Sequence, residues 1–557
     1  MKIEKKQRFN GQANRVYRVP VTRFNAIKDN PNALMELAYQ FIQNHQNYQV
    51  PRIQELKQYY LAQNDIKNKA DSPNPYHSNN KIASAFARYI TNIRVGYFLG
   101  NDIQFKVQQT GSVQQSVADK LDEQLQVFNQ TSDESYIEEQ IKKDLSVCGR
   151  AYDLVFVNPG ETTLNLAVVD PETAFVVYDD SVKEQPLFAV RYYQTGVLDN
   201  DLVEQYEIYT SDTVFRFHTD GGFPEMNTPM PYAVLDSQEP LFFGRVPMTE
   251  YYNNDERTGD WEPELDLIDA LDDSVSSMAD FQDDFDNANI ILTGKFANLT
   301  EPVYKLDKDG KKVIGADGQP IVLEPAHPNV NPHNHLWYLE PYAQPTGING
   351  GRAMVNPDAK YLTKTYDSDG WKEYTDFLIG EVHKYTNTPN VNDPNFASNA
   401  SGVAMSYKLW GADQERKIQE ALYKKGLFSR LCACVAYWQK LNILPQAVNT
   451  ATLAQVIQPN FVPNLPKNDQ ETALLVQTLN ATGLFSAETL RELAEPITGV
   501  SADTEQQRDD DETVKQQNAT DAYNQGVTGI GKVFATGEPA VVEQPVKGDE
   551  NEPAETD

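Results

Sequence analysis

The chain has 557 residues, of which 40% are hydrophobic and 29 are tyrosines, enough to build cores in several domains. Its 48 basic and 80 acidic residues give a net charge of −32, which argues against tight DNA binding through neutralised phosphates. No run approaches the roughly 18 apolar residues of a membrane helix, and the first residues do not resemble a signal peptide. Only three cysteines occur, Cys148, Cys432 and Cys434, too few for a disulfide framework. We expect a folded protein of a reducing compartment.

The first 150 residues are expected to be mainly helical. Ser78-Asn79-Asn80 supplies N-cap side chains ahead of an amphipathic pattern that includes Phe86 and Ile90, so a helix is expected from there to Gly100. Ile103 to Val107 alternates as a strand does. The other expected helices cover residues 33–43, 50–60, 115–128 and 135–147.

From Cys148 to about Phe243 the pattern changes to β-strands. Short runs rich in branched and aromatic residues are separated by turns such as Asn158-Pro159-Gly160. The expected strands are 151–157, 175–178, 188–193, 203–209 and 214–217. Their regular spacing predicts an antiparallel sheet.

Glu262-Pro263 is expected to open a helix, because proline and acids both favour the first turn. Its apolar residues form a narrow stripe with a spacing of three and four: Ile268, Leu271, Val275, Met278, Phe281 and Phe285. Aspartates cover much of the rest, and we expect them to form a solvated or channel-facing acidic surface. Such a stripe is typical of a helix packed along one seam, as in a bundle or ring. Residues 293–365 are β-like again, with hairpin turns expected at Asp309-Gly310 and Asp317-Gly318.

A helix, a stiff polar loop and a very long helix are predicted over residues 366–440. Trp371, Tyr374, Leu378 and Val382 recur at helical spacing in the first helix. The loop at 387–401 has two prolines and five asparagines, which remove donors and compete for backbone hydrogen bonds. The second helix is expected to run from Gly402 to about Lys440, whereas an average helix has about 11 or 12 residues. A polar loop of this length is more often functional or mobile than a plain connection.

The C-terminal part is expected to hold a strand at 454–457 and helices at 470–480 and 486–495. From Ser501 the chain is acidic and poor in large apolar residues, so a disordered tail is predicted.

No catalytic, cofactor-binding or metal-binding residues are predicted. Residues 526–532 match the spacing of a phosphate loop, but Val533 stands where Ser or Thr should bind magnesium, and no buried strand precedes. His327, His333 and His335 lack a nearby cysteine to complete a tetrahedral site, so a polar loop is favoured. Cys432-Ala433-Cys434 lacks a second pair, and we expect it in a buried helix.

Several blocks, taken in order, carry a family resemblance. They are Ser78-Asn79-Asn80-Lys81-Ile82 through Tyr97-Phe98-Leu99-Gly100, Cys148-Gly149-Arg150-Ala151-Tyr152, Val169-Asp170-Pro171-Glu172, Arg191-Tyr192-Tyr193, Arg245 to Asn254, Leu267-Ile268-Asp269-Ala270, Ser401-Gly402-Val403-Ala404-Met405, Asn464-Leu465-Pro466 and Gly483-Leu484-Phe485-Ser486. Over about residues 35–500 the chain resembles the portal proteins of tailed bacteriophages, of the type found in siphophages of Gram-positive hosts.

The resemblance implies an α+β portal fold that assembles into a ring of about twelve subunits around a DNA channel. It implies an α/β wing, a two-helix stem, a β-containing clip, a long wing helix and a helical crown. The implied divisions are 1–261 (N-terminal region and wing), 262–292 (first stem helix), 293–365 (clip), 366–387 (second stem helix), 388–401 (tunnel loop), 402–466 (long helix and rest of the wing), 467–500 (crown) and 501–557 (acidic disordered tail).

The resemblance also implies site residues and partners. The tunnel-loop residues expected to face DNA are Asn387, Thr388, Asn390, Asn392, Asn395, Phe396, Ser398 and Asn399. The residues expected to pack the stem are Ile268, Leu271, Val275, Met278, Phe285, Tyr374, Leu378 and Val382. The expected partners are further copies of the chain, double-stranded DNA bound without sequence preference, the large terminase subunit, a head-completion or neck protein, and the major capsid and scaffolding proteins. The expected location is the portal vertex of the virion, and the host cytoplasm during assembly.

Two other functions stay open at this point. A nucleotide-driven packaging enzyme would need a phosphate loop on a strand, and this chain offers only the defective copy in the tail. Another structural or adhesion protein of the virion would use the β region as a binding module.

Overall fold

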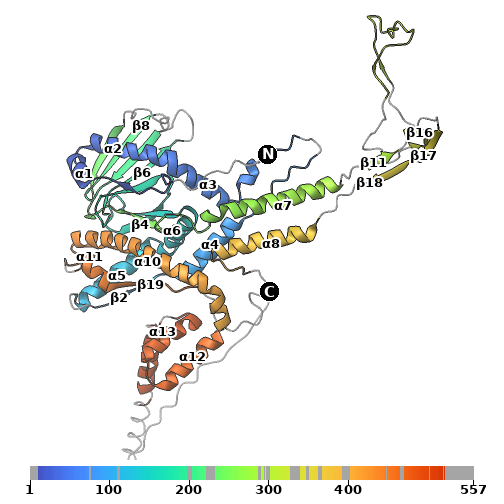
Figure 1. Ribbon diagram of the computed structural model, residues 1–557. Coiled ribbons are helices and arrows are strands. Elements are labelled where there is room, and N and C mark those ends of the chain that lie inside the picture. The colour runs from blue at the N-terminus through green and yellow to red at the C-terminus, as the bar shows by residue number, and fades with distance from the viewer. Residues whose placement is uncertain are drawn as a thin grey trace, which may run out of the picture. The chain divides into compact units, whose positions relative to one another are not determined.

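The computed structural model describes residues 11–73, 77–109, 113–196, 203–220, 233–286, 290–293, 295–296, 302–326, 339–346, 351–361, 367–391, 402–446, 448, 450–464, 469–500, 502, 504–518 and 520. The chain divides into two compact units, residues 1–464 and 465–557. Helices and strands are mixed in the first unit (Figure 1), and the predicted α+β class is confirmed.

The described residues before Arg150 contain six α-helices: α1 (Val21–Ile27), α2 (Pro31–Asn44), α3 (Val50–Tyr60), α4 (Phe86–Leu99), α5 (Gln115–Thr131) and α6 (Glu134–Cys148). α2 begins where the Asn30 side chain accepts a hydrogen bond from the Ala33 amide, with Pro31 in the first turn. The predicted start of α4 is wrong. Ser78-Asn79-Asn80 does not cap it, because the helix begins only at Phe86 and the preceding residues are extended.

Ten strands precede α7: β1 (Tyr17–Arg18), β2 (Gln104–Val107), β3 (Arg150–Val157), β4 (Leu164–Val169), β5 (Ala174–Tyr178), β6 (Pro186–Thr195), β7 (Val203–Tyr209), β8 (Thr213–Asp220), β9 (Val234–Pro240) and β10 (Met248–Tyr252). Nine of them form a six-stranded sheet in the order β1-β5-β6-β7-β8-β9 and a three-stranded sheet in the order β10-β3-β4, and β2 belongs to neither. The antiparallel prediction holds for every pair except β1 with β5, which is parallel. Two sheets replace the single sheet we expected.

Three long helices follow: α7 (Leu265–Asp286), preceded by a 3-10 turn at Glu262–Glu264, then α8 (Ser368–Tyr385) and α10 (Gly402–Lys440). α8 begins where the Asp367 side chain accepts a hydrogen bond from the Gly370 amide at 2.9 Å. Figure 1 shows α7 and α8 running side by side.

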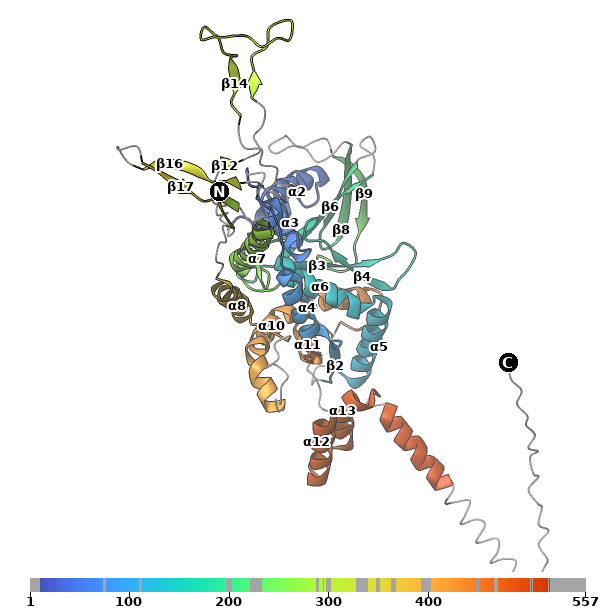
Figure 2. The same cartoon turned by 90° about the vertical axis from the view of Figure 1, so that its right-hand side faces the viewer.

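Short strands lie between α7 and α8: β11 (Ile290–Thr293), β12 (Lys295–Phe296), β13 (Val303–Tyr304), β14 (Val322–Glu324), β15 (Leu339–Glu340), β16 (Tyr342–Thr346), β17 (Gly351–Val355) and β18 (Asp358–Tyr361). They pair two by two, as Figure 2 shows for β16 and β17. The two predicted turns are confirmed, since Gly310 and Gly318 have φ of 76° and 74°, which glycine adopts without strain. Bridges join Leu306 to Lys312 and Ile314 to Pro320 around them.

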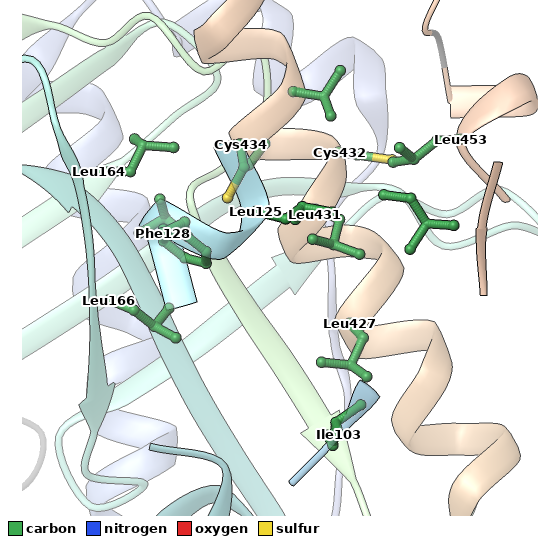
Figure 3. Packing of buried hydrophobic residues seen from close by; sticks show 14 of the residues in the cluster. Ile103, Leu125, Phe128, Leu164, Leu166, Leu427, Leu431, Cys432, Cys434 and Leu453 are labelled. Carbon is green, nitrogen blue, oxygen red and sulfur yellow. The ribbon is translucent and has the colours of Figure 1, made fainter. Parts of the chain in front are cut away.

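The largest core surrounds the second half of α10 (Figure 3). Leu427, Leu431 and Cys434 are almost completely buried there against α5 and β4. The predicted buried setting of Cys432 and Cys434 is confirmed, and all three cysteines are free and buried. After α10, residues 450–456 form α11 (Thr450–Val456), and β19 (Ile457–Asn460) pairs with β2. The predicted strand at 454–457 is therefore wrong except at Ile457.

The second unit contains α12 (Asp469–Thr482) and α13 (Ala487–Thr498), close to the helices we expected. The Ser486 side chain caps α13 by accepting a hydrogen bond from the Thr489 amide at 3.2 Å. The tail, which we expected to be disordered, is helical over 504–518. Good helix formers such as Glu, Gln and Arg occupy this stretch, and Asp509 pairs with Arg491 of α13 at 2.5 Å. In the described ranges, no helix combines the length and apolar character that a membrane crossing requires.

Candidate functional site

The site begins with the helix pair α7–α8, in which part of each predicted stripe is buried. Ile268, Leu271, Leu378 and Val382 are at most 3% exposed. The Trp371 indole donates a hydrogen bond from α8 to the Ser274 carbonyl of α7 at 3.3 Å. These contacts join the two helices along one seam.

The remaining predicted packing residues differ in how far they are buried. Val275 and Met278 are half-buried, and the side chain of Phe285 lies outside the described residues. Tyr374 is 48% exposed, so about half of its surface is uncovered within one chain. The packing role predicted for Val275, Met278, Phe285 and Tyr374 stays a prediction.

Asp266 of α7 is exposed, as expected for a solvated or channel-facing surface, but several of the other aspartates accept hydrogen bonds from the chain itself. Residues 69–73 and 77–84, together called the arm below, lie along the helix, and in the second segment every other backbone amide donates to a side chain of α7. The amides of Ser78, Asn80, Ile82 and Ser84 donate to Asp284, Asp280, Ser276 and Asp272 at 2.8, 2.6, 2.9 and 2.7 Å. Two residues of an extended chain advance about 6.6 Å, and four residues of a helix advance about 6.0 Å. Every second amide of the arm therefore lies beside every fourth residue of α7.

Side chains add to this ladder of hydrogen bonds. Asn80 donates to Asp280 and Asp283, and His77 lies 2.5 Å from Asp284. Nearer the start of α7, Asn64 donates to Asp272 and Lys69 pairs with Asp273. Burial raises the pKa of Asp272, whereas hydrogen bonds from Ser78 hold the pKa of Asp284 below its usual value.

The loop after α8 begins in a fixed conformation. Asn387 adopts a left-handed φ of 48°, and its side chain donates to Glu415 of α10 at 3.1 Å. The Tyr89 hydroxyl of α4 donates to the Pro389 carbonyl at 3.1 Å and accepts from the Val391 amide at 3.2 Å. The described start of the loop is thus attached to two other helices.

This geometry corrects one predicted DNA-facing residue. Thr388 is only 2% exposed, and its hydroxyl donates to the Thr386 carbonyl at 3.2 Å, so it anchors the loop instead of facing a ligand. Asn387 is exposed and Asn390 is half-buried. The other five predicted loop residues, Asn392, Asn395, Phe396, Ser398 and Asn399, lie outside the described residues.

Arg94 is the central anchor of this junction, and the sequence analysis missed it. Its side chain is 4% exposed, pairs with Glu415 at 2.6 Å and also donates to the Thr386 carbonyl. The α4, α8 and α10 helices meet at this one guanidinium. It supplies a hydrogen-bond donor to a backbone carbonyl at the C-terminal end of α8. A charged residue within the apolar pattern of residues 86–99 was the available signal.

A second buried network holds the middle of α10. Lys142 donates to Asn253 at 3.2 Å and to Gln419 of α10 at 2.8 Å, and Asp260 accepts from both amides at 2.8 Å. Burial disfavours the charge on Asp260, but Lys142 and Arg94 outweigh it, so the pKa of Asp260 stays below its usual value.

A third network holds the C-terminal half of α10. Arg430 is 1% exposed and lies between Glu138 of α6 and Asp153 of β3, with Glu134 at 3.4 Å. Burial raises the pKa of Asp153 to about 6 even though Arg430 opposes the shift. Because a buried charge must be paired, these contacts fix the long helix at a single register and rotation.

The described residues contain no group of three or more His, Cys, Asp or Glu placed to hold a metal ion. The predicted histidine loop and the phosphate-loop match lie outside the described residues. What the described part provides is a helix pair, an anchored loop start and a rigidly held long helix.

Comparison with known sequences places the chain in a structural class, the portal proteins of bacteriophages. It belongs to the family described as "Phage portal protein, SPP1 Gp6-like", whose profile matches residues 39–517. The resemblance noted from the sequence is thus confirmed. This family is structural rather than enzymatic.

One curated relative is the portal protein of Bacillus phage SPP1. It is 25% identical over 251 residues, which are 42% of this chain and 47% of the relative. The match therefore spans about half the length of that protein. A solved structure, the neck of an empty GTA particle computed with C6 symmetry, covers 75% of this chain and 90% of its own, with 12% identity and a TM-score of 0.35.

Proposed function

We propose that this protein forms a ring at one vertex of a phage capsid, through which double-stranded DNA enters and leaves. The observation that carries the proposal is the junction of α8, the anchored loop start and α10, within a chain of the portal family. The tunnel loop proposed at residues 388–401 would thus begin from a rigid base, because Thr386, Asn387 and Pro389 are hydrogen-bonded to α4 and α10.

The acidic character of the protein constrains how DNA would pass. Phosphates are repelled by an acidic wall and are touched only weakly by neutral Asn and Ser, so DNA can slide. Lysine or arginine contacts would instead release counterions and hold the duplex. We infer non-specific, weak contact with DNA, at the loop residues 388–401.

The division into wing, stem, clip, crown and tail remains part of the proposal. α7 and α8 would be the stem, the paired strands between them the clip, and α12 with α13 the crown. The ring would have about twelve copies, as closed cyclic symmetry allows. Its partners would be the large terminase subunit, a neck protein, and the major capsid and scaffolding proteins, in the virion and in the host cytoplasm during assembly.

Lysine substitutions test the loop. Replacing Asn392, Asn395 and Asn399 by lysine should slow packaging of full-length genomes, because each new cation can hold a phosphate. A matched control places lysines at exposed positions outside the helix–loop–helix, such as Thr163 and Val182. Unchanged packaging by the loop variant would count against loop–DNA contact.

An ATPase assay separates this proposal from a packaging motor. A portal ring should show no hydrolysis above a buffer blank, with or without DNA. Hydrolysis by the purified chain, abolished by Lys532→Ala in the phosphate-loop match, would favour the motor.

A further inference from the structure

In a ring, the acidic helices α7 and α8 of neighbouring copies would repel one another. α7 has no basic residue and is rich in aspartate. α8 carries Asp369, Glu373, Asp376 and Glu381 against only Lys372 and Lys384. Copies of such a helix pair, placed side by side, repel one another unless cations lie between them.

The arm and its base carry three lysines, and two of them already pair with a carboxylate. Lys69 pairs with Asp273 of α7, and Lys81 pairs with Asp71 within the arm at 2.9 Å. Lys67, at the base of the arm, donates to the Lys81 carbonyl at 2.5 Å and is exposed. The ladder to α7 holds this cationic segment along the helix and uses three of its aspartates as acceptors.

The arm also has an apolar residue turned away from the core. The amide of Ile82 is bonded to Ser276, but its side chain is 41% exposed. An apolar side chain between two lysine-bearing segments is a typical feature of a polar-rimmed contact surface.

One flank of α8 has the complementary character. Tyr374, Phe377 and Tyr385 are 48%, 58% and 54% exposed and recur at helical spacing. Glu373 beside them is exposed, whereas Glu381 is only 17% exposed and pairs with Lys384 at 3.0 Å. The buried residues Leu378 and Val382 face α7, so this flank is a separate part of the helix circumference. Aromatic rings with a carboxylate among them suit a partner surface that offers lysines and an apolar side chain.

Ring symmetry decides which surface meets this flank. A patch that packs on its own copy closes a dimer, whereas a ring of more than two copies needs two different patches on each subunit. In Figure 1 the arm (blue) and α8 lie on opposite sides of α7, so both can be reached from neighbouring copies.

We propose that the arm of one copy packs on the α8 flank of the next copy, with Lys67 beside Glu373 and Ile82 against Phe377. This inference rests on the proposed ring. Its consequence is that the ladder on α7 organises the subunit boundary as well as the single chain.

Zero-length carbodiimide cross-linking of wild-type rings tests the contact directly. Rings are assembled from an equal mixture of unlabelled and nitrogen-15 chains, and the cross-linked peptides are identified by mass spectrometry. Mixed-isotope pairs joining Lys67 to Glu373 are expected. If Lys67 links to the α8 acids only within one isotope, or not at all, in rings seen by electron microscopy, the inference is overturned.

A disulfide pair gives a second, independent reading. The native cysteines are buried, so Ile82→Cys with Phe377→Cys introduces the only cysteines expected to be accessible. Oxidised rings should give covalent trimers and larger species on a denaturing gel, because head-to-tail contacts repeat. The control pairs Val182→Cys with Phe377→Cys, since Val182 is fully exposed.

The outcomes keep the two proposals apart. Rings without the Ile82–Phe377 series, or with an equal series in the control, overturn the arm contact and leave the ring standing. Wild-type chains that form no rings overturn the proposed function, and the arm contact with it. If the double variant fails to assemble, the cross-linking of wild-type rings decides the matter.

Discussion

Arg94 of α4 and Glu415 of α10 form an ion pair of 2.6 Å at the point where α8 ends. The same carboxylate accepts from Asn387, and the same guanidinium donates to the Thr386 carbonyl. The start of the loop is therefore held by charge-assisted hydrogen bonds to α4, which is distant in sequence, and to α10, which follows the loop.

Arg94→Ala should release this junction. Removing one partner of a buried pair costs about 3–5 kcal/mol, and Glu415 is 30% exposed, so we expect about 3 kcal/mol. Urea unfolding measures the loss in free energy of unfolding, and hydrogen exchange of the amides in residues 386–391 measures the release of the loop start. Lys417→Ala is the control on the same helix, because its exposed pair with Asp413 should contribute only about 0–1 kcal/mol. Equal losses in both variants would contradict the assignment of Arg94 as the anchor.

Two glycines give a matched test of how closely α10 is packed. A Cβ at Gly426 would lie 2.3 Å from the Tyr251 ring, whereas nothing lies within 4 Å of one at Gly380 in α8. Gly426→Ala should destabilise the protein by about 1–3 kcal/mol through overpacking. Gly380→Ala should stabilise it by up to about 1 kcal/mol through helix propensity. Thermal unfolding of the two variants should therefore shift in opposite directions, and a shared direction would contradict this packing.

Glu250 should make stability depend on pH. Burial raises its pKa, but Arg257 at 3.0 Å and Arg150 at 3.8 Å outweigh burial and hold the pKa below its usual value. A depressed pKa means that the ionised carboxylate stabilises the fold above the unfolded pKa of about 4.3, and that this contribution is lost as pH falls through the folded value. Glu250→Gln should thus be less stable than wild type near neutral pH.

The difference between wild type and Glu250→Gln should shrink at lower pH. Free energies of unfolding, measured from neutral pH down to about pH 3, give the comparison. A difference that stays constant over this range would show that ionisation of Glu250 does not contribute.

Asp280→Ala should loosen the arm. The carboxylate accepts from the Asn80 amide at 2.6 Å, and a hydrogen bond to a charged group contributes about 1.5–3 kcal/mol. Exchange of the Asn80 amide should therefore accelerate roughly tenfold or more. Asp266→Ala removes an exposed aspartate of the same helix and should leave that amide unchanged. Protection of Asn80 that survives in Asp280→Ala would show that the ladder does not hold the arm.

Local sequence patterns predicted most helices and strands, because hydrophobic period and turn residues act over short ranges. These patterns gave wrong predictions where a residue's contacts lie far away in the sequence. Ser78-Asn79-Asn80 has the composition of a helix cap, but its amides meet aspartates about two hundred residues later. Residues 454–456 have strand-like composition but are helical, and the strand that pairs with β2 begins only at Ile457.

The candidate site shows the same limit. The helix–loop–helix was visible from its polar loop and its uninterrupted second helix, since both are local features. The burial of Thr388 and the role of Arg94 depend on α4 packing against α8 and α10. A single sequence carries no signal for that tertiary contact beyond a charge in an apolar pattern.

Cryo-electron microscopy of the purified full-length chain, averaged without imposed symmetry, tests the central claim most directly. The account predicts closed rings of about twelve copies with a central hole, and with α7 and α8 of every copy beside it. Monomers, trimers or open filaments as the stable species, across protein concentration and salt, would contradict the portal assembly.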